Sequence, residues 1–314
     1  MIKTLTGILL LSALALGSCG RSRPEGPVHN AHTFPRTATV TPAAAGPADM
    51  PPVREAAIAA GKLFCLTGAD DACLLAFPGA DIDAVPDTAG AIGQGPSEWI
   101  MPAIFTAVPD SLAVYDTGRN TFTTLGADLV PRTRRCAIDD RLRHVKAIDW
   151  PVVGYVRSTA DSVALMIADI ASGAIIDSIS FPSTPRDHFE FQWSTTGSQL
   201  VIASVLTDEI FIYSLDSDHR PQLRLTLVGD SDLGRSHYTD VDCAPDRFYV
   251  LNASAVDFST RDGSTVIEAY NYDGESLAAI NTGVCATLFQ PLPGGREGLL
   301  VAPSSDRPLR IPLK

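Results

Sequence analysis

The stretch Val114-Tyr115-Asp116-Thr117-Gly118 ends a short apolar strand in a polar turn, and the recurrence of this pattern decides the fold. Aspartate and glycine suit tight hairpins, because aspartate can bond its own backbone and glycine accepts positive φ. In each repeat another apolar strand follows the turn. The pattern predicts successive antiparallel hairpins, and it returns in Ile167-Ala168-Asp169, Ile212-Tyr213-Ser214-Leu215-Asp216 and Asn271-Tyr272-Asp273-Gly274.

The length of the repeat selects the architecture. The aspartates at positions 116, 169, 216 and 273 are 53, 47 and 57 residues apart. A period of about 45 residues holding four strands is typical of a propeller blade, and about 250 residues then give five or six blades. We predict an all-β, six-bladed β-propeller, with five or seven blades less favoured. The alternative, a large β-sandwich, has no reason to repeat at this length.

Apolar runs of strand length are spread along the chain and support this interpretation. They are rich in β-branched and aromatic residues and are separated by Gly, Asp, Asn, Pro and Ser. No long amphipathic helix is predicted; residues 54–62 could form one or two helical turns. The predicted strands are 112–115, 163–167, 200–205, 210–213, 248–251, 266–272 and 299–301.

Composition excludes several classes of protein. The chain has 314 residues, of which 45% are hydrophobic and 19% charged, which is typical of a globular protein. Its 36 acidic and 24 basic residues give a net charge of -12. Such acidity argues against binding to nucleic acid or to anionic lipid through a basic face. We expect no nucleic-acid partner, and we expect a monomer.

The N-terminus has the features of an export signal. Lys3 gives a short basic start, and an apolar run follows that is shorter than the ~20 residues that span a bilayer. Leu16-Gly17-Ser18-Cys19 resembles a bacterial lipobox, which implies that residues 1–18 are a lipoprotein signal peptide and that Cys19 is lipidated. The alternative is an ordinary signal peptide. Because Gly20 and not aspartate follows the cysteine, we expect the periplasmic face of the outer membrane.

The segment after Cys19 is rich in Pro, Ala and Thr and has few large apolar residues. Such a composition buries too little surface to offset the entropy of ordering. We therefore predict a lipidated, flexible tether over residues 19–52 and a propeller domain over residues 53–314.

Five cysteines remain after Cys19, an odd number for an oxidising compartment. Cys65 and Cys73 flank a polar turn, so a hairpin could bring them within range of a disulfide. Alternatively all five are small buried apolar residues. Of the two interpretations we favour one bridge, between Cys65 and Cys73.

Three stretches resemble known propeller families. Residues 193–204 are similar to the TolB-type repeat but have Thr195-Thr196 where that family has proline and aspartate, and residues 114–120 resemble an NHL-type blade. Ile92-Gly93-Gln94-Gly95-Pro96-Ser97-Glu98-Trp99 resembles a glycine-rich stretch of six-bladed, TolB-like lipoproteins of Bacteroidetes. The resemblance, over residues 63–314, implies a propeller in the cell envelope and carries no catalytic residues.

Candidate binding residues come from two places. Glycines in the 92–99 stretch permit close approach of a ligand, which Gln94, Glu98 and Trp99 could contact. The interpretation that we favour there is a structural turn, with Glu98 bonded to backbone amides. His237 and Asp240, with Asp242 nearby, form a second candidate, although acidic clusters in such a chain are mostly solvated turns.

The predicted function follows from the anchor, the tether and the propeller. Because the common enzyme motifs are missing, we expect a non-enzymatic binding module for an envelope protein or glycan, without a cofactor. The alternative is a metal-dependent hydrolase or lactonase whose axial carboxylates hold calcium or zinc. Only this alternative calls for a metal.

Overall fold

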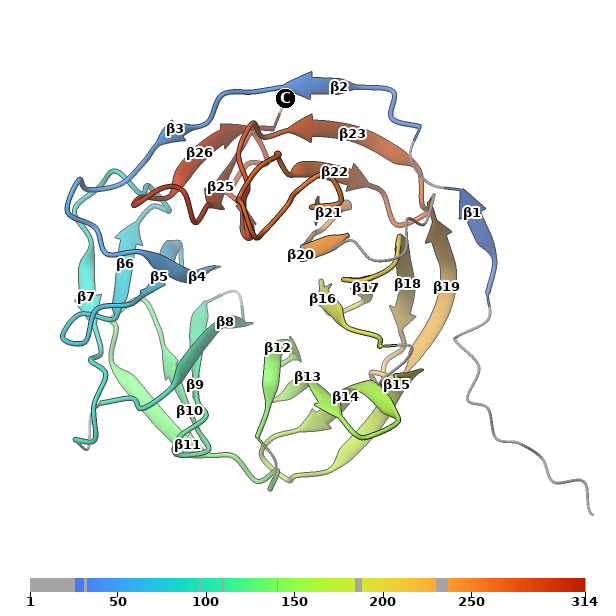
Figure 1. Ribbon diagram of the computed structural model, residues 1–314. Coiled ribbons are helices and arrows are strands. Elements are labelled where there is room, and N and C mark those ends of the chain that lie inside the picture. The colour runs from blue at the N-terminus through green and yellow to red at the C-terminus, as the bar shows by residue number, and fades with distance from the viewer. Residues whose placement is uncertain are drawn as a thin grey trace, which may run out of the picture.

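The computed structural model describes residues 26–30, 33–95, 98–108, 110–139, 141–183, 188–229 and 237–313. Six sheets surround a central axis as the blades of a propeller (Figure 1). The described residues contain no helix that is long and apolar enough to cross a membrane. The predicted all-β, six-bladed propeller is confirmed. Residues 1–25, with the predicted signal peptide and Cys19, lie outside the described part of the chain.

Blades 1 to 3 each consist of four consecutive antiparallel strands, with the first strand innermost. Blade 1 contains β4 (Val53–Ala59), β5 (Lys62–Thr67), β6 (Leu74–Pro78) and β7 (Asp87–Ala89). Blade 2 contains β8 (Pro102–Val108), β9 (Ser111–Asp116), β10 (Thr121–Leu125) and β11 (Pro131–Arg135). Blade 3 contains β12 (Arg143–Asp149), β13 (Val152–Ser158), β14 (Ser162–Asp169) and β15 (Ile175–Pro182).

Blades 4 to 6 each include one strand from the N-terminal segment, namely β1 (Val28–Asn30), β2 (Thr37–Thr39) or β3 (Ala43–Ala44). Blade 4 contains β16 (Phe191–Thr195), β17 (Gln199–Ser204), β18 (Glu209–Leu215) and β19 (Pro221–Val228), with β1 outermost. Blade 5 contains β20 (Tyr238–Ala244), β21 (Arg247–Asn252), β22 (Val266–Tyr270) and β23 (Ser276–Asn281), with β2 outermost. Blade 6 contains β24 (Leu288–Pro291), β25 (Glu297–Val301) and β26 (Leu309–Pro312), with β3 as its fourth strand.

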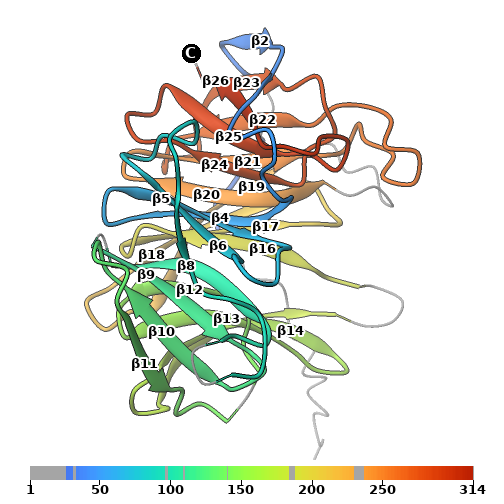
Figure 2. The ribbon, with the colours of Figure 1, turned by 90° about the vertical axis from the view of Figure 1, so that its left-hand side faces the viewer.

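The N-terminal segment differs from the predicted flexible tether over residues 19–52. Its strands β1, β2 and β3 lie along the outside of the ring, and both ribbon views place β2 outside β23 (Figures 1 and 2). β1 and β2 pair in parallel with β19 and β23, and β3 pairs antiparallel with β26. Because β3 comes from one end of the chain and β26 from the other, their pairing closes the ring.

Backbone hydrogen bonds hold this segment, which explains why its composition is misleading. Pro27 accepts a 2.8 Å bond from the Thr226 amide, and Ala45 donates a 2.9 Å bond to the Pro308 carbonyl. Most of its side chains stay exposed, and Ala45 and Met50 are buried only near its end. Small side chains are no obstacle to adding a strand at a sheet edge, where the main chain supplies the bonds.

The alanine-rich stretch 54–62, for which one or two helical turns were predicted, forms β4 and the turn into β5. β4 is the innermost strand of blade 1. Six such strands converge on the axis, so the small side chains of Ala56 and Ala57 fit where space is limited. Tertiary context here overrides the helix propensity of alanine.

The core consists of six apolar clusters, one at each junction between neighbouring blades. At the junction of blades 3 and 4, Trp193 is 1% exposed and donates a 2.8 Å bond from Nε1 to the His144 carbonyl. Gly154 provides the space for the ring, because a Cβ at this position would overlap it. Close packing of Trp193 against β12 and β13 therefore joins blades 3 and 4.

The structure also explains the uneven spacing of the repeated aspartates. Asp169 ends the third strand of its blade, and Asp216 and Asp273 lie between the third and fourth strands of theirs, whereas Asp116 ends the second strand of blade 2. The equivalent turn of blade 2 contains Asp128. Starts of successive innermost strands are 49, 41, 48, 47 and 50 residues apart, which is the true repeat.

The predicted disulfide between Cys65 and Cys73 is not formed in the structure. Both cysteines are free and fully buried. Cys65 packs in the cluster between blades 6 and 1, while Cys73 packs in the cluster between blades 1 and 2. The two thiols thus belong to opposite sides of the blade. Burial raises the pKa of Cys65 to about 12 and that of Cys73 to about 11, so both stay protonated near neutral pH.

Candidate functional site

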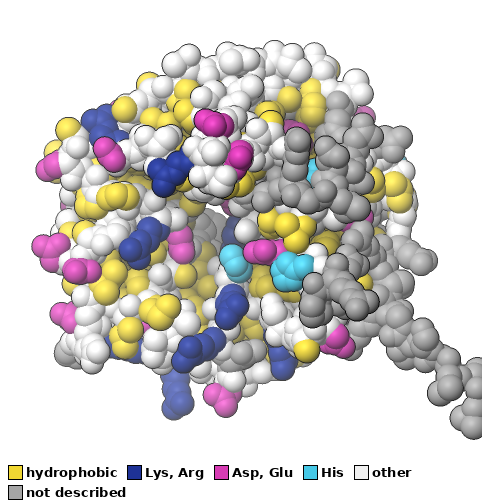
Figure 3. Space-filling view, viewed as in Figure 1, with side chains coloured by type: hydrophobic (Ala, Val, Ile, Leu, Met, Phe, Trp, Pro, Cys, Tyr) yellow, Lys and Arg dark blue, Asp and Glu magenta, His cyan; other side chains and the backbone are white. Residues whose placement is uncertain are grey.

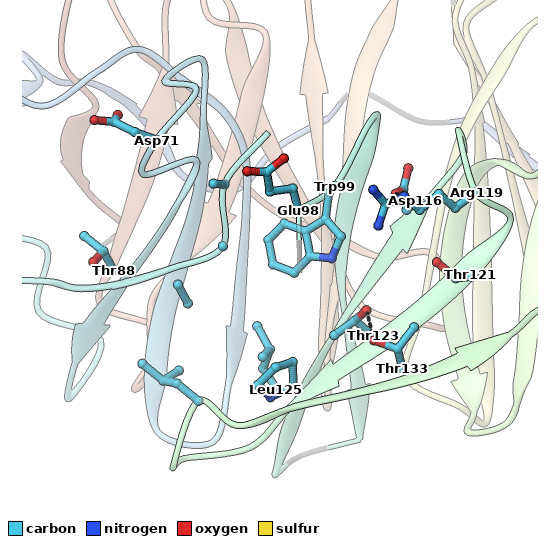
Figure 4. A pocket seen from close by; sticks show the side chains of 15 residues that line it. Asp71, Thr88, Glu98, Trp99, Asp116, Arg119, Thr121, Thr123, Leu125 and Thr133 are labelled. Atoms are coloured by element: carbon cyan, nitrogen blue, oxygen red, sulfur yellow. Dashed lines mark hydrogen bonds and ion pairs between the residues drawn. The ribbon is translucent and has the colours of Figure 1, made fainter. Parts of the chain in front are cut away.

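A groove of about 680 Å³ lies between blades 1 and 2, and we call it the side groove (Figure 4). One wall comes from β7 and the chain that follows it, and the other from β10 and β11. The lining residues are Asp71, Thr88, Ala89, Gly90, Ala91, Glu98, Trp99, Asp116, Arg119, Thr121, Thr123, Leu125, Leu129, Pro131 and Thr133. Six apolar side chains, four threonines and four charged side chains give this groove a mixed surface.

Glu98 has the structural role that we favoured for it. Its carboxylate accepts a 2.6 Å hydrogen bond from the Gly95 amide, and a Cβ at Gly93 or Gly95 would crowd the same carboxylate. The glycines therefore make room for Glu98 within its own loop. Gln94 is exposed and does not line the groove. Pro96 and Ser97, also part of the motif, lie outside the described residues.

Blade 2 holds this loop in place. Arg119 donates a 2.6 Å bond from Nη2 to the Gly95 carbonyl. The Asp116 carboxylate accepts bonds of 3.1 and 3.0 Å from the Ile100 and Met101 amides. Asp116 and Arg119 line the groove, and their side chains hold the backbone of the neighbouring loop.

Trp99 lies in the middle of the side groove, with its indole ring directed toward Leu125 (Figure 4). It is only 7% exposed and belongs to the core cluster between blades 1 and 2. Gly90 makes room for the ring, because a Cβ there would overlap it. Beyond it, Thr123 and Thr133 share a 2.9 Å hydrogen bond between their hydroxyl groups. Trp99 therefore forms part of the floor of the groove, and little of its ring face is accessible to a ligand.

β7 is the outermost strand of blade 1 and, among the described residues, pairs only with β6. Its outer edge therefore leaves backbone N–H and C=O groups without a strand partner. Thr88 and Ala89 of this strand line the side groove. The groove thus runs beside an open sheet edge.

A second hollow, of about 560 Å³, lies on the propeller axis, and we call it the axial channel. All six innermost strands line it near the points where they turn into the second strands. The space-filling view, which looks at the propeller from the same side as Figure 1, shows acidic, basic and histidine side chains near the centre of the face turned to the viewer (Figure 3). Polar lining residues of the channel are Thr106, Lys146, Ser194, Thr195, Asp242, Tyr249 and Gln290.

Burial and charge change the protonation of Asp242, which lines the channel, and of two further carboxylates, Asp240 and Glu55, on which the charge of Lys146 also acts. Burial, together with the nearby charge of Asp240, raises the pKa of Asp242 to about 7, against the opposing effect of Lys146. Burial likewise raises the pKa of Asp240 and of Glu55, while hydrogen bonds from backbone amides lower it. A carboxyl group that titrates near neutral pH on the wall of a cavity is a common mark of a functional site.

Two of these carboxylates also link neighbouring blades. Asp240 accepts a 2.8 Å bond at Oδ2 from the Phe289 amide, and Glu55 accepts a 2.6 Å bond at Oε2 from the Ile104 amide. In both cases donor and acceptor are 49 residues apart, one blade repeat. Asp240 and Glu55 therefore stabilise the ring around the channel.

The predicted binding residues are not brought into one site. Glu98 and Trp99 line the side groove, whereas Asp240, on β20, lines neither hollow. His237 is 2% exposed and precedes β20, where its carbonyl accepts a 2.6 Å bond from the Ala253 amide. Among the described residues, no group of three or more His, Cys, Asp or Glu side chains could hold a metal ion.

Lys146 and Gln290 were not among the predicted site residues, and Asp242 was named only as a neighbour of His237 and Asp240. The alternation of Asp240 and Asp242 on a strand places both on one face, and this signal was available. No local pattern brings Lys146 from β12 to β20, because blade 4 lies between them.

Comparisons with known proteins identify the fold. No family model matches the chain, and no curated protein matches it. The β-propeller domain of Cps50 (Swd1) from Myceliophteria thermophila is similar, with a TM-score of 0.53 and 9% identity over 84% of this chain and 98% of that one. A putative exported protein from Bacteroides fragilis is similar with a TM-score of 0.51 and 11% identity, over 84% and 88% of the two chains. At these identities the likeness shows the propeller fold, and the TolB-like or NHL-like assignment stays a prediction.

Proposed function

We propose that the protein is a lipid-anchored binding module of the cell envelope, and that its propeller binds an extended segment of a partner protein in the side groove. The observation that carries this proposal is the open edge of β7 beside a groove of about 680 Å³. An extended peptide can add a strand to such an edge, with main-chain bonds providing affinity and side-chain contacts providing specificity.

The chain's own N-terminal segment supports strand addition. β1 and β2 lie as fifth strands on the outer edges of β19 and β23, with mostly exposed side chains. The same kind of strand would extend blade 1, whose outermost strand β7 has an open edge. In the side groove the added strand would also contact the threonine hydroxyls of β10 and β11.

A peptide fits the side groove better than a glycan, which is the other ligand class that the sequence suggests. The 7% exposure of Trp99 leaves little ring face on which a sugar could stack. Asp116 and Arg119 already bond the 93–101 loop, so they are poor candidates for hydroxyl recognition. A row of backbone donors and acceptors, by contrast, matches a peptide main chain residue by residue.

Blocking the groove should abolish peptide binding. Thr133 is exposed on β11 and faces the groove, so Thr133→Trp fills the groove, with the loss of one hydroxyl bond to Thr123. Arg134 is the next residue on the same strand, is also exposed and faces the other way, so Arg134→Trp is the matched control. Peptides selected from a random displayed library on the full chain in detergent should bind Thr133→Trp at least about tenfold more weakly, and Arg134→Trp within about twofold.

Two outcomes of this experiment would contradict the proposal. One is that Thr133→Trp and Arg134→Trp bind the selected peptides equally well. The other is that no peptide is selected while a glycan array, read with the same protein, gives binding that Thr133→Trp removes. The second outcome would assign the groove to a glycan.

The lipid anchor rests on Cys19 and the residues before it. Replacing Cys19 with Ala removes the thiol that carries the first acyl chain, and acyl chains contribute ~0.8 kcal/mol per buried methylene. We expect Cys19→Ala to move from the outer-membrane fraction to the soluble fraction on cell fractionation, while Cys73→Ala stays with the membrane. Membrane retention of Cys19→Ala would refute the anchor.

A further inference from the structure

The axial channel contains a pair of opposite charges that the proposed function does not use. Lys146 and Asp242 are the charged side chains among the described residues that line it. They come from blade 3 and blade 5, and the Lys146 ammonium group reaches β20, the strand that carries Asp242. The surrounding wall is largely apolar and includes Ile104, Phe105 and Leu292.

Lys146 reaches across the junction with blade 4 to blade 5. Its Nζ donates a 3.3 Å hydrogen bond to the Val241 carbonyl. An ammonium group has three donors, and the described residues place no carboxylate oxygen within ion-pair distance of this one. The lysine charge is therefore available to a ligand in the channel.

The two carboxylates near Lys146, Asp240 and Asp242, differ in the number of hydrogen bonds that their oxygens already accept. Asp240 accepts amide bonds at both oxygens, from Val241 and Phe289. Asp242 accepts a 2.8 Å bond from Gln290 Nε2 and lines the channel itself. Asp242 is thus the carboxylate that a ligand in the channel can contact.

These charges select the class of ligand. A simple anion near Lys146 would be repelled by Asp242 and Asp240, and a simple cation near Asp242 would be repelled by Lys146. A molecule with one carboxylate and one ammonium satisfies both groups. We propose that the axial channel binds a small zwitterion, an amino acid or short peptide, whose carboxylate contacts Lys146 and whose ammonium contacts Asp242.

The size and the walls of the channel agree with such a ligand. Its volume of about 560 Å³ falls in the range of small-molecule sites. Phe105, Tyr249 and Leu292 offer apolar contacts to a side chain, while Gln290 and Ser194 offer hydrogen bonds to a peptide group. This site is independent of the side groove, and either can fail without the other.

Calorimetric titration of the full chain in detergent tests the charge pattern. The probes are the common amino acids and a set of alanine-containing dipeptides. The tightest of them is then compared with its N-acetylated form, its amide and the doubly blocked form. We expect the zwitterion to bind at least about tenfold more tightly than either singly charged form. Binding by no probe, or equal binding by the blocked forms, would overturn the proposal.

Variants separate charge recognition from damage to the fold. In Asp242→Asn the zwitterion should lose at least about tenfold in affinity, and the N-acetylated form should bind as well as the zwitterion. In Lys146→Met the amide should bind as well as the zwitterion. Asp149→Asn, at an exposed carboxylate on the same strand as Lys146, should bind like the unaltered protein. Equal weakening of all four probe forms by Asp242→Asn and Lys146→Met would mean a structural role and contradict the assignment.

The affinity should also depend on pH. Asp242, which faces Lys146, Asp240 and Gln290 and has Cys243, Tyr249 and Tyr272 nearby, has a pKa of about 7. Its carboxylate form, which attracts the ammonium, increases as pH rises through that value. From about pH 6 to about pH 7.5 the affinity for the zwitterion should rise about fivefold to tenfold. Asp242→Asn should remove this rise, and a rise that persists in Asp242→Asn would contradict the role of that carboxylate.

Discussion

A chain that begins at Gly46 should unfold at a much lower temperature than one that begins at Gly26. The shorter chain lacks β1, β2 and β3, so blade 6 keeps three strands and the ring is no longer closed by pairing of its two ends. It also loses bonds such as those at Pro27 and Ala45. At about 1 kcal/mol for each hydrogen bond, several lost bonds should lower the melting temperature by at least about 10 °C.

A point variant isolates the contribution of ring closure. Ala45 is 2% exposed and its amide donates to the Pro308 carbonyl at 2.9 Å, so Ala45→Pro removes that bond and strains the junction. Ala48→Pro, three residues further on at an exposed position, is the matched control. We expect a large fall in melting temperature for Ala45→Pro and little change for Ala48→Pro. Equal melting of the Gly26 and Gly46 chains would show that β3 does not close the ring.

Replacing Trp193 with Ala should be the most damaging single substitution between blades 3 and 4. The side chain is 1% exposed and packs with Phe191, Leu165 and Ile179 among other residues of that junction. Truncation leaves a cavity and removes the bond to the His144 carbonyl. The free energy of unfolding, from chemical denaturation, should fall by about 3–5 kcal/mol.

Trp193→Phe serves as the control for this substitution. Phenylalanine keeps most of the apolar contact but has no Nε1 donor, so the fall should be about 1–2 kcal/mol. If Trp193→Ala costs no more than Trp193→Phe, the ring does not carry the packing of this junction. The space made by Gly154 would then need another explanation.

The fold was predictable because its signals are local and repeated. The turn aspartates at positions 169, 216 and 273 occupy equivalent hairpins. Each strand also carries its own signal, either an alternation of apolar and polar residues or a short apolar run. The N-terminal strands were missed because main-chain bonds to distant strands hold them, and composition does not record such bonds. β4 was missed because alanine favours helices when tertiary contacts are ignored.

The candidate sites were predictable only in part. Residues 92–99 drew attention through their glycines, and these glycines make room for Glu98 within the loop. The side groove depends on Thr123 and Thr133 of another blade, which carry no local motif. The charge pair of Lys146 and Asp242 depends on strands from two blades converging on the axis, which follows from the folded ring and not from sequence spacing.

Amide hydrogen exchange with a selected peptide tests strand addition most directly. The peptide is bound to the full chain, and exchange is followed at residues 87–91, which comprise β7 and the two residues after it. The outer strand β15 of blade 3 serves as the reference. Strand addition in the side groove should slow exchange at residues 87–91 and leave β15 unchanged, and Thr133→Trp should remove the effect. Unchanged exchange at residues 87–91 under saturating peptide would contradict the proposed function.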